Sequence, residues 1–276
     1  MMAIDLRKIS RNDVVTRVAR AFAIQFDPTT EIRKRRSLGC RTNRDTWVRI
    51  EVRPVERIDG QGWNGPECAA VIQGVAKPEW YQGVSWLDQN EQLMWRADET
   101  QLIESEPVKR GSANPSLSDT WWATLTSSLH TLAAFPTTRV ATPTMQPITE
   151  DRLTSVIHKV FPDVDTRVGE WTTAHGDLFW TNLTAPDCWL LDWEDWGRAP
   201  RGYDAASLWH SSLAVPALAE RVHHELRGEL DTRSGQLCQL MRCAETLTAP
   251  PGYADELLAS ATAHAHRLVR QLTQPA

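Results

Sequence analysis

The chain has 276 residues, of which 41% are hydrophobic and 24% charged, with a net charge of −5. These ordinary values exclude wholesale disorder, and the length allows one large domain or two lobes. No apolar run approaches the roughly 20 residues of a membrane-spanning helix, and the first residues are too polar for a signal peptide, so we expect a soluble, cytoplasmic protein without a membrane partner.

The cysteine and charge patterns indicate the redox compartment and argue against some kinds of functional site. The five cysteines form no Cys-x-x-Cys pair and are odd in number, which indicates a reducing compartment and gives little support to a zinc site or a thiol nucleophile. Residues 1–60 hold 14 of the 30 basic residues but only 8 of the 35 acidic ones. The basic run at 33–36 is too short and isolated to indicate a nucleic-acid partner.

The N-terminal third is predicted to be mostly sheet. A helix capped by Ser10 comes first, with Val14, Val18 and Phe22 on one face. Strands at 37–42 and 46–53 form a hairpin through 43–45, and a short helix begins near 64–67 with Pro66 in its first turn. Further strands are expected at 80–87, 92–97 and 101–103.

A change from strand-like to helical patterning marks the domain boundary. Residues 104–119 contain Pro107, Gly111 and Pro115 together with several serines, which is typical of a linker. We therefore predict an N-terminal, mostly sheet lobe at 1–105, a hinge at 106–118, and a helical C-terminal lobe at 119–276.

The C-terminal lobe is predicted to be helical except around its central loop. Ser118 or Asp119 caps a helix that runs to about Ala134, and Thr149 caps another. The chain after Asp204 is helical almost to the end, with one segment interrupted at Pro216 and the last two separated at 250–252.

A stretch of polar residues between these helices carries the chemistry. It reads Ala-His-Gly-Asp-Leu-Phe-Trp-Thr-Asn at 174–182 and is followed by Leu-Leu-Asp-Trp-Glu at 190–194. Phosphoryl transfer requires a hydroxyl held in line with a γ-phosphate and Mg²⁺ fixed by hard oxygen ligands. Asp177 has the position to orient the acceptor hydroxyl and take its proton, while Asn182 and Asp192 supply metal-binding oxygens. The apolar residues 188–191 predict a short strand, and Asp192 lies at its end. The alternative is that the motif is an ordinary turn and Asp192 a solvated hairpin acid.

The order of these residues resembles the aminoglycoside phosphotransferase and choline kinase family, which has His-Gly-Asp and Asp-x-Glu in place of the protein-kinase His-Arg-Asp and Asp-Phe-Gly. The resemblance extends through Pro-Arg-Gly-Tyr-Asp-Ala-Ala at 200–206 and covers roughly residues 171–210. It implies an α+β, two-lobed protein-kinase-like fold with Asp177 and His175 as catalytic-loop residues. The lobe at 1–105 would then bind the nucleotide, and the lobe at 119–276 would carry the catalytic loop and the acceptor site. We assign His175 to bracing the loop by a ring hydrogen bond, and Asp204 to a helix cap or loop brace.

The nucleotide side departs from the kinase pattern. The Gly-x-Gly-x-x-Gly loop is absent, and the strand that would carry a phosphate-binding Lys offers Arg49 or Arg53. Lys77 and Arg96 are further candidates. Glu67 is predicted either to pair with the phosphate-binding cation or to complete a capping box.

The resemblance implies a Mg²⁺-dependent phosphotransferase that moves the γ-phosphoryl group of ATP or GTP to a hydroxyl of a small molecule, such as an aminoglycoside or another natural product. One alternative is a kinase-like enzyme that phosphorylates Ser or Thr of a peptide in ribosomal peptide modification. A second alternative is a pseudokinase scaffold that binds a nucleotide or a partner protein, which the missing glycine loop favours.

Overall fold

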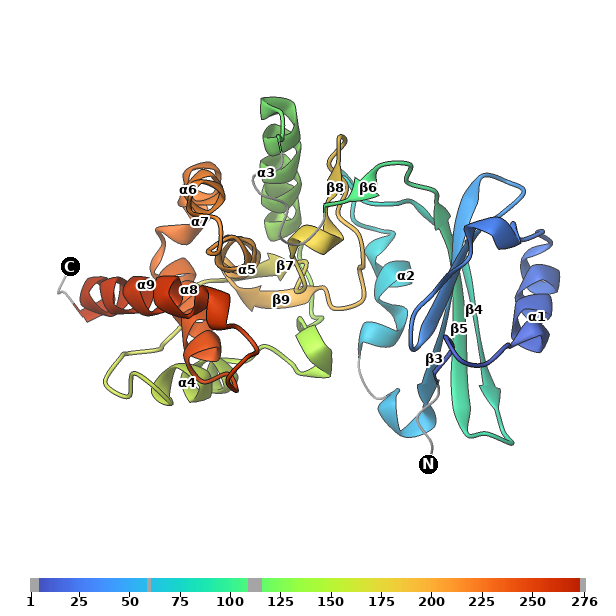
Figure 1. Ribbon diagram of the computed structural model, residues 1–276, viewed down its shortest axis with the longest axis horizontal. Helices are drawn as coiled ribbons and strands as arrows, with labels where there is room; N and C mark the ends of the chain where they lie inside the picture. The colour runs from blue at the N-terminus through green and yellow to red at the C-terminus, as the bar shows by residue number, and fades with distance from the viewer. Residues whose placement is uncertain (1–4, 59–60, 109–115, 274–276) are drawn as a thin grey trace. The chain divides into compact units, whose positions relative to one another are not determined.

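The computed structural model describes residues 5–58, 61–108 and 116–273. These residues form two compact units (Figure 1). Unit 1 comprises the described residues of Met1–Val71 and Lys77–Glu104, and unit 2 comprises those of Ile72–Ala76 and Ser105–Ala276. Unit 1 contains an antiparallel sheet and unit 2 is mainly helical, as predicted for an α+β protein with one lobe of each kind.

Unit 1 is built on a five-stranded antiparallel sheet with the strand order β1-β2-β3-β5-β4. Its strands are β1 (Ile32–Arg33), β2 (Ser37–Arg41), β3 (Thr46–Pro54), β4 (Trp80–Asp88) and β5 (Leu93–Gln101). Its helices are α1 (Asn12–Phe22), α2 (Gly65–Ala69) and the short η1 (Pro28–Thr30), η2 (Val55–Arg57) and η3 (Gln61–Asn64). The predicted hairpin through 43–45 is therefore present between β2 and β3.

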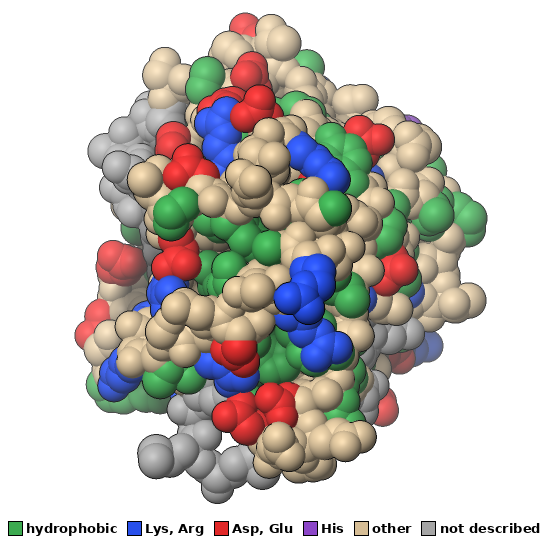
Figure 2. Space-filling model, turned by 90° about the vertical axis from the view of Figure 1, so that its right-hand side faces the viewer, with side chains coloured by type: hydrophobic (Ala, Val, Ile, Leu, Met, Phe, Trp, Pro, Cys, Tyr) green, Lys and Arg blue, Asp and Glu red, His purple; other side chains and the backbone are tan. Residues whose placement is uncertain are grey.

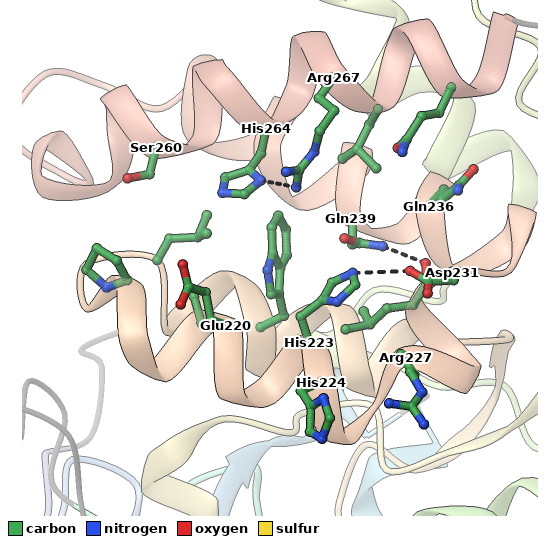
Figure 3. A pocket seen from close by; sticks show the side chains of 17 residues that line it. Glu220, His223, His224, Arg227, Asp231, Gln236, Gln239, Ser260, His264 and Arg267 are labelled. Carbon is green, nitrogen blue, oxygen red and sulfur yellow. Dashed lines mark hydrogen bonds and ion pairs between the residues drawn. The ribbon is translucent and has the colours of Figure 1, made fainter.

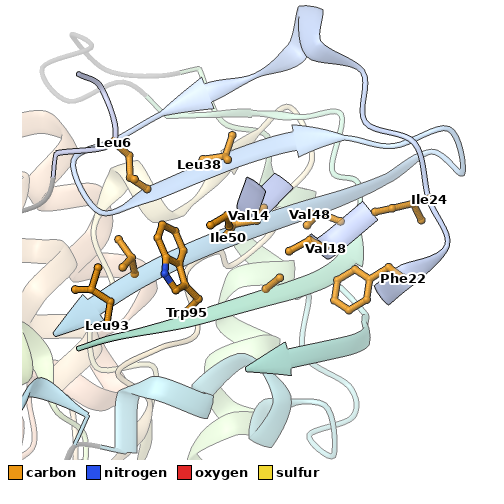
Figure 4. Close-up of a cluster of buried hydrophobic side chains, with 12 residues drawn as sticks. Leu6, Val14, Val18, Phe22, Ile24, Leu38, Val48, Ile50, Leu93 and Trp95 are labelled. Atoms are coloured by element: carbon orange, nitrogen blue, oxygen red, sulfur yellow. The ribbon is translucent and has the colours of Figure 1, made fainter. Parts of the chain in front are cut away.

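The core of unit 1 lies between α1 and one face of this sheet (Figure 4). Helix α1 contributes Val14, Val18 and Phe22 at helical spacing. Alternate residues of the strands meet them, because successive strand side chains point to opposite faces. The strand contribution includes Val48, Ile50, Val52, Leu93, Trp95 and Ala97. The intervening residues of β3 and β5 consequently face away from α1.

Two local predictions for unit 1 need correction. The residue before α1 is Arg11 rather than Ser10, and Ser10 instead donates to Asn12 Oδ1 at 2.8 Å. The separate strand predicted at 101–103 is absent, since Gln101 is the last residue of β5 and pairs with Thr46. The short helix predicted near 64–67 is confirmed as α2, which has Pro66 in its first turn and no capping hydrogen bond from the Asn64 side chain.

Unit 2 consists of seven α-helices in its described part, with short two-stranded sheets between them. The helices are α3 (Asp119–Ala134), α4 (Glu150–His158), α5 (Tyr203–Ser211), α6 (Pro216–Glu225), α7 (Arg227–Leu230), α8 (Arg233–Leu247) and α9 (Asp255–Thr273), with η4 (Pro143–Met145) and η5 (Trp180–Asn182) as single short turns. Strand β6 (Glu106–Pro107) pairs with β8 (Thr184–Ala185), and β7 (Trp171–Ala174) pairs with β9 (Gly197–Pro200).

The predicted caps of unit 2 are confirmed. Ser118 accepts from Trp121 N–H at the start of α3, and Thr149 accepts from Arg152 N–H at the start of α4. Pro216 does not interrupt a helix but begins α6, where its missing N–H costs no intrahelical hydrogen bond. The predicted hinge at 106–118 includes residues 109–115, which lie outside the described part.

Cysteine and tryptophan side chains mostly belong to the interior. All five cysteines are free thiols, and burial raises the pKa of Cys188, Cys238 and Cys243 to about 12, so none of these three is a nucleophile at neutral pH. Trp180 is buried against Trp121 and Trp122 with ring centroids 6.1 and 6.2 Å away. It therefore packs in the core and is not placed to stack on a ligand.

Charges of both signs share the surface of unit 1. Figure 2 views the side that carries α1, where Lys and Arg side chains alternate with Asp and Glu side chains. The guanidinium of Arg17 on α1 lies 4.7 Å from the Trp86 ring centroid and that of Arg11 lies 4.8 Å from Trp95. Across residues 5–58, 61–108 and 116–273, no helix combines the length and apolarity that crossing a bilayer requires.

A half-buried histidine makes unit 2 sensitive to acid. Burial lowers the pKa of His210 to about 4, and its Nε2 lies 2.8 Å from Thr246 Oγ1, joining α5 to α8. The unfolded chain, with a histidine pKa of about 6.5, takes up the proton first, so stability is complete above pH 6.5 and falls towards pH 4 by roughly 3 kcal/mol.

We expect His210→Gln to remove most of this loss of stability in urea titrations at several pH values. His130→Gln, at an exposed position of α3, is the control and should retain it; equal acid sensitivity in both variants would contradict the assignment.

Candidate active site

The loop that follows β7 is organised around the buried ring of His175. Its Nε2 lies 2.8 Å from the Leu191 carbonyl oxygen, so this nitrogen carries the proton and donates. Its Nδ1 then accepts from the Asp177 N–H at 3.4 Å. The ring is fully buried and packs edge-on against Trp193 with centroids 4.9 Å apart. His175 thus makes the predicted ring hydrogen bond, and neither nitrogen is available to take a substrate proton.

A second brace comes from Asp204 in the first turn of α5. Its two carboxylate oxygens accept from the backbone N–H groups of His175 and Gly176 at 2.6 and 3.0 Å. Gly202, not Asp204, is the N-cap of this helix. Burial raises the pKa of the Asp204 carboxyl, while His175 and the two N–H donors oppose that rise. Of the two roles predicted for Asp204, the structure shows the loop brace.

Gly176 lets the loop pass close to the chain around Asp195. Its φ is +85°, and a Cβ at this position would lie 2.5 Å from the Asp195 carbonyl oxygen. A side chain here would therefore be both conformationally strained and in contact with backbone. Steric exclusion of a side chain therefore explains why the His-Gly-Asp motif has glycine at this position.

Asp177 and Asn182 are held together at the two ends of the loop. The Nδ2 of Asn182 donates to the Asp177 carbonyl oxygen at 2.8 Å and to its Oδ2 at 3.0 Å. In the part of unit 2 that the structure describes, no donor pairs with the other amide oxygen, Oδ1 of Asn182. This oxygen is the atom expected to bind a metal ion.

A hairpin carries the chain from Asn182 to Asp192. Leu183 and Leu190 form an antiparallel bridge, and the Leu191 N–H donates to the Asn182 carbonyl oxygen at 2.8 Å. The strand predicted at 188–191 is reduced to this bridge, because the Leu190 N–H donates instead to the Ala76 carbonyl oxygen at 2.7 Å.

Asp192 follows the hairpin directly, at a half-buried position. Its φ of +66° is in the left-handed region, which Asp tolerates better than most residues. The preceding residue, Leu191, is bound on both sides, to His175 through its carbonyl oxygen and to Asn182 through its N–H. These two hydrogen bonds join the loop at 175–182 to the chain at 190–192.

The donor set suits a Mg²⁺ ion held together with phosphate oxygens. Mg²⁺ is usually bound by one or two carboxylates plus water and substrate phosphates rather than by a full protein cage. Asn182 and Asp192 would supply one amide and one carboxylate oxygen. This set is smaller than a cage: within the described residues no group of three or more His, Cys, Asp or Glu side chains is arranged to hold a metal ion.

Unit 1 carries the candidates for phosphate binding on the sheet face that points away from α1. Arg49 and Arg53 project from β3 on either side of Glu51, and both pair with it; the Arg49 Nη2 to Glu51 Oε2 distance is 3.6 Å. The Arg53 guanidinium is buried and lies 5.6 Å from the Trp63 ring centroid. No Lys occurs in β3, so the cations of this strand are arginines.

Glu67 of α2 pairs with Arg96 of β5 at 3.0 Å. Arg96 also forms a two-bond fork with Asp98, at 2.7 and 2.6 Å. Burial opposes the charge on Arg96, but Asp98 and Glu67 outweigh it and hold its pKa above the ordinary value. Arg96, one of the further candidates from the sequence, is therefore the residue that this structure brings to Glu67.

Sequence reasoning missed Asp98 as part of this charged face. The β3–β5 register places Asp98 opposite Arg49, and Arg96 opposite Glu51, so opposite charges alternate across the two strands. The available signal was the spacing of two between Arg96 and Asp98, which puts both on one strand face. Lys77, the remaining candidate, precedes β4, and burial lowers its pKa.

Comparisons with known proteins give a likeness in fold. No protein-family model matches the chain, and no curated protein matches its sequence. Among solved structures, the amicoumacin kinase hAmiN, described in complex with AMP-PNP, Ca²⁺ and Ami, aligns over 96% of this chain and 95% of its own with 10% identity and a TM-score of 0.59. An aminoglycoside phosphotransferase, APH(2")-IIia, described with GDP and kanamycin, aligns over 95% and 99% with 14% identity and a TM-score of 0.57.

A third similar structure is a choline/ethanolamine kinase family protein from Mesorhizobium loti, which aligns over 95% of this chain and 98% of its own with 14% identity and a TM-score of 0.53. The kinase-like fold expected from the motif is therefore confirmed: this chain has the fold of aminoglycoside phosphotransferases and of choline/ethanolamine kinase family proteins.

We expect Asp204→Asn to loosen the loop at 175–177, because an amide offers one acceptor oxygen where the carboxylate offers two, and its NH₂ group would face a backbone donor. Hydrogen exchange of the His175 and Gly176 amides should accelerate, and unfolding should cost about 1–3 kcal/mol less. Asp163→Asn, at an exposed site in unit 2, should change neither. Unchanged exchange in Asp204→Asn would show that the carboxylate does not hold the loop.

Proposed function

We propose that this protein is a phosphotransferase that moves the γ-phosphoryl group of ATP or GTP to a hydroxyl of a small-molecule acceptor, with Mg²⁺ as cofactor. The observation that carries the proposal is the hydrogen-bonded arrangement of Asp177, Asn182 and Leu191, which precedes Asp192, in a chain of kinase-like fold. Similar solved structures described with nucleotides and with antibiotics support a nucleotide and a small acceptor.

In this proposal each side chain of the loop has a separate task. The Asp177 carboxylate accepts the hydrogen bond of the acceptor hydroxyl and takes its proton as the phosphoryl group transfers. The Asn182 amide, which donates to that carboxylate, fixes its orientation and presents Oδ1 on the other side. His175 and Asp204 keep the backbone in place without touching substrate.

Asn182 Oδ1 and the Asp192 carboxylate are the residues that would hold Mg²⁺, and the ion when bound would neutralise charge on the nucleotide phosphates. In unit 1 we assign phosphate binding to Arg49 and Arg53, with Glu67 ordering the charged sheet face through Arg96. A guanidinium fork binds phosphate oxygens in pairs, so arginine can perform this task, although with a different geometry from lysine.

Asp177→Asn should lower turnover about 10²–10⁴-fold, since it removes the proton acceptor, with little change in nucleotide affinity. Transfer of ³²P from labelled ATP or GTP to a panel of aminoglycosides and Ser/Thr peptides would measure this. Asp187→Asn, at an exposed position of the same hairpin, is the matched control. Transfer to peptides alone would replace the small-molecule acceptor by the peptide alternative, and undiminished transfer in Asp177→Asn would reject the assignment of the base.

Asp192→Asn should weaken nucleotide binding itself, and only when Mg²⁺ is present, because the carboxylate acts through the ion. Isothermal titration with ATP and GTP, with and without Mg²⁺, separates these cases, again with Asp187→Asn as control. Metal-independent binding that the variant leaves intact would favour the pseudokinase scaffold over an active transferase.

A further inference from the structure

Unit 2 contains a cavity of about 550 Å³ that is lined by none of the residues described above as the candidate active site (Figure 3). Side chains of α5 to α9 line it, and neither the loop at 174–192 nor Asp204 contributes. Its apolar part consists of side chains that are themselves buried, namely Trp209, Leu213, Leu230 and Leu268. The cavity therefore has a preformed hydrophobic wall.

Two arginines line the cavity without a carboxylate partner. Arg227 and Arg267 form no ion pair with any acid in the described part of the chain, unlike Arg221 on the neighbouring α6, which pairs with Glu225 at 2.8 Å. Both side chains are exposed, and a cation without an internal carboxylate partner can bind an anion without first displacing a protein carboxylate.

Arg267 also sets the proton position of a third lining residue. Its Nη2 lies 2.6 Å from His264 Nδ1, and a guanidinium can only donate, so Nδ1 accepts and the His264 proton is on Nε2. Burial, together with the positive charges of Arg267 and His223, lowers the pKa of His264 and keeps the ring neutral. The edge of this ring packs on Trp209 with centroids 5.0 Å apart. In the described residues, the His264 Nε2–H donates to no acceptor.

Two acids also line the cavity, and in the described residues neither forms an ion pair with Arg227 or Arg267. Asp231 lies 3.2 Å from His223 Nε2 and is paired with it. Glu220 lies towards the end of the cavity near Ser260, whereas Arg227 lies at the end near Asp231 (Figure 3). Within the described residues, the N–H donors of Arg267 and His264 are therefore not taken up by a carboxylate.

We infer that this cavity binds a small organic anion whose carboxylate or phosphate oxygens accept from Arg267 and His264, with Arg227 nearby, and whose apolar body packs on Trp209. Binding pockets for small molecules are typically apolar with a few convergent polar groups, and planar guanidinium groups recognise carboxylate and phosphate oxygens in pairs. The inference concerns a second site and does not depend on the proposed phosphotransfer.

The test is an NMR titration that follows the ring resonances of His264 and Trp209 in the full-length protein. The probes are phenyl phosphate and benzoate, which separate the two oxyanions, benzylammonium, which has a similar ring and the opposite charge, and inorganic phosphate, which lacks the apolar body. We expect one or both aromatic anions to shift these resonances saturably, and Arg267→Gln to weaken that binding about tenfold or more.

Arg270→Gln is the matched control, since Arg270 is exposed on the same helix and does not line the cavity. Arg227→Gln, on α7, should also weaken binding of the aromatic anions, and it provides a second test if the α9 variant folds poorly. The inference is overturned if neither aromatic anion shifts His264, if benzylammonium or inorganic phosphate binds as well as the aromatic anions, or if both lining variants bind like Arg270→Gln.

Discussion

The Asp204 carboxylate is the contact on which the rest of the candidate active site depends. It is buried and accepts from two consecutive backbone N–H groups of the loop, at His175 and Gly176. A buried N–H without a partner costs more than a hydrogen bond contributes, so these two groups must face an acceptor wherever the loop goes. The carboxylate on α5 thereby fixes the start of the loop against the most buried part of unit 2.

A chain of hydrogen bonds connects this contact to Asp177 and to the residue before Asp192. The His175 ring reaches the Leu191 carbonyl oxygen, and the Leu191 N–H reaches Asn182, whose side chain returns to Asp177. The path closes on itself, so displacement of any member disturbs the others. Such closed networks hold functional groups more rigidly than isolated contacts do, which explains why residues that touch no substrate are needed beside those that do.

Sequence analysis identified those residues of the site that lie close together along the chain. The spacing of Asp177, Asn182 and Asp192 is a property of 16 consecutive residues, and it remains interpretable whatever surrounds it. The helix start at Ser10 was misplaced because Arg11 pairs with Glu91, which lies 80 residues further on, and no local pattern encodes that contact. The strand at 188–191 failed similarly, since the hydrogen-bond partner of Leu190 is Ala76.

The charged sheet face of unit 1 contains three arginines with several carboxylate partners, instead of the single Lys–Glu ion pair of kinases. Arginine stays protonated even when buried, so three of them on one sheet face require nearby carboxylates, and the β3–β5 register supplies these at Glu51 and Asp98. Arg96 is held by Asp98 as well as by Glu67, which fixes the direction of its guanidinium, while Arg49 and Arg53 of β3 both pair with Glu51. Arg49 and Arg53 lie on the strand that would carry the phosphate-binding Lys, whereas Arg96 of β5 is the residue that Glu67 contacts. We therefore assign phosphate binding to Arg49 and Arg53, and the ordering of the sheet face to Arg96.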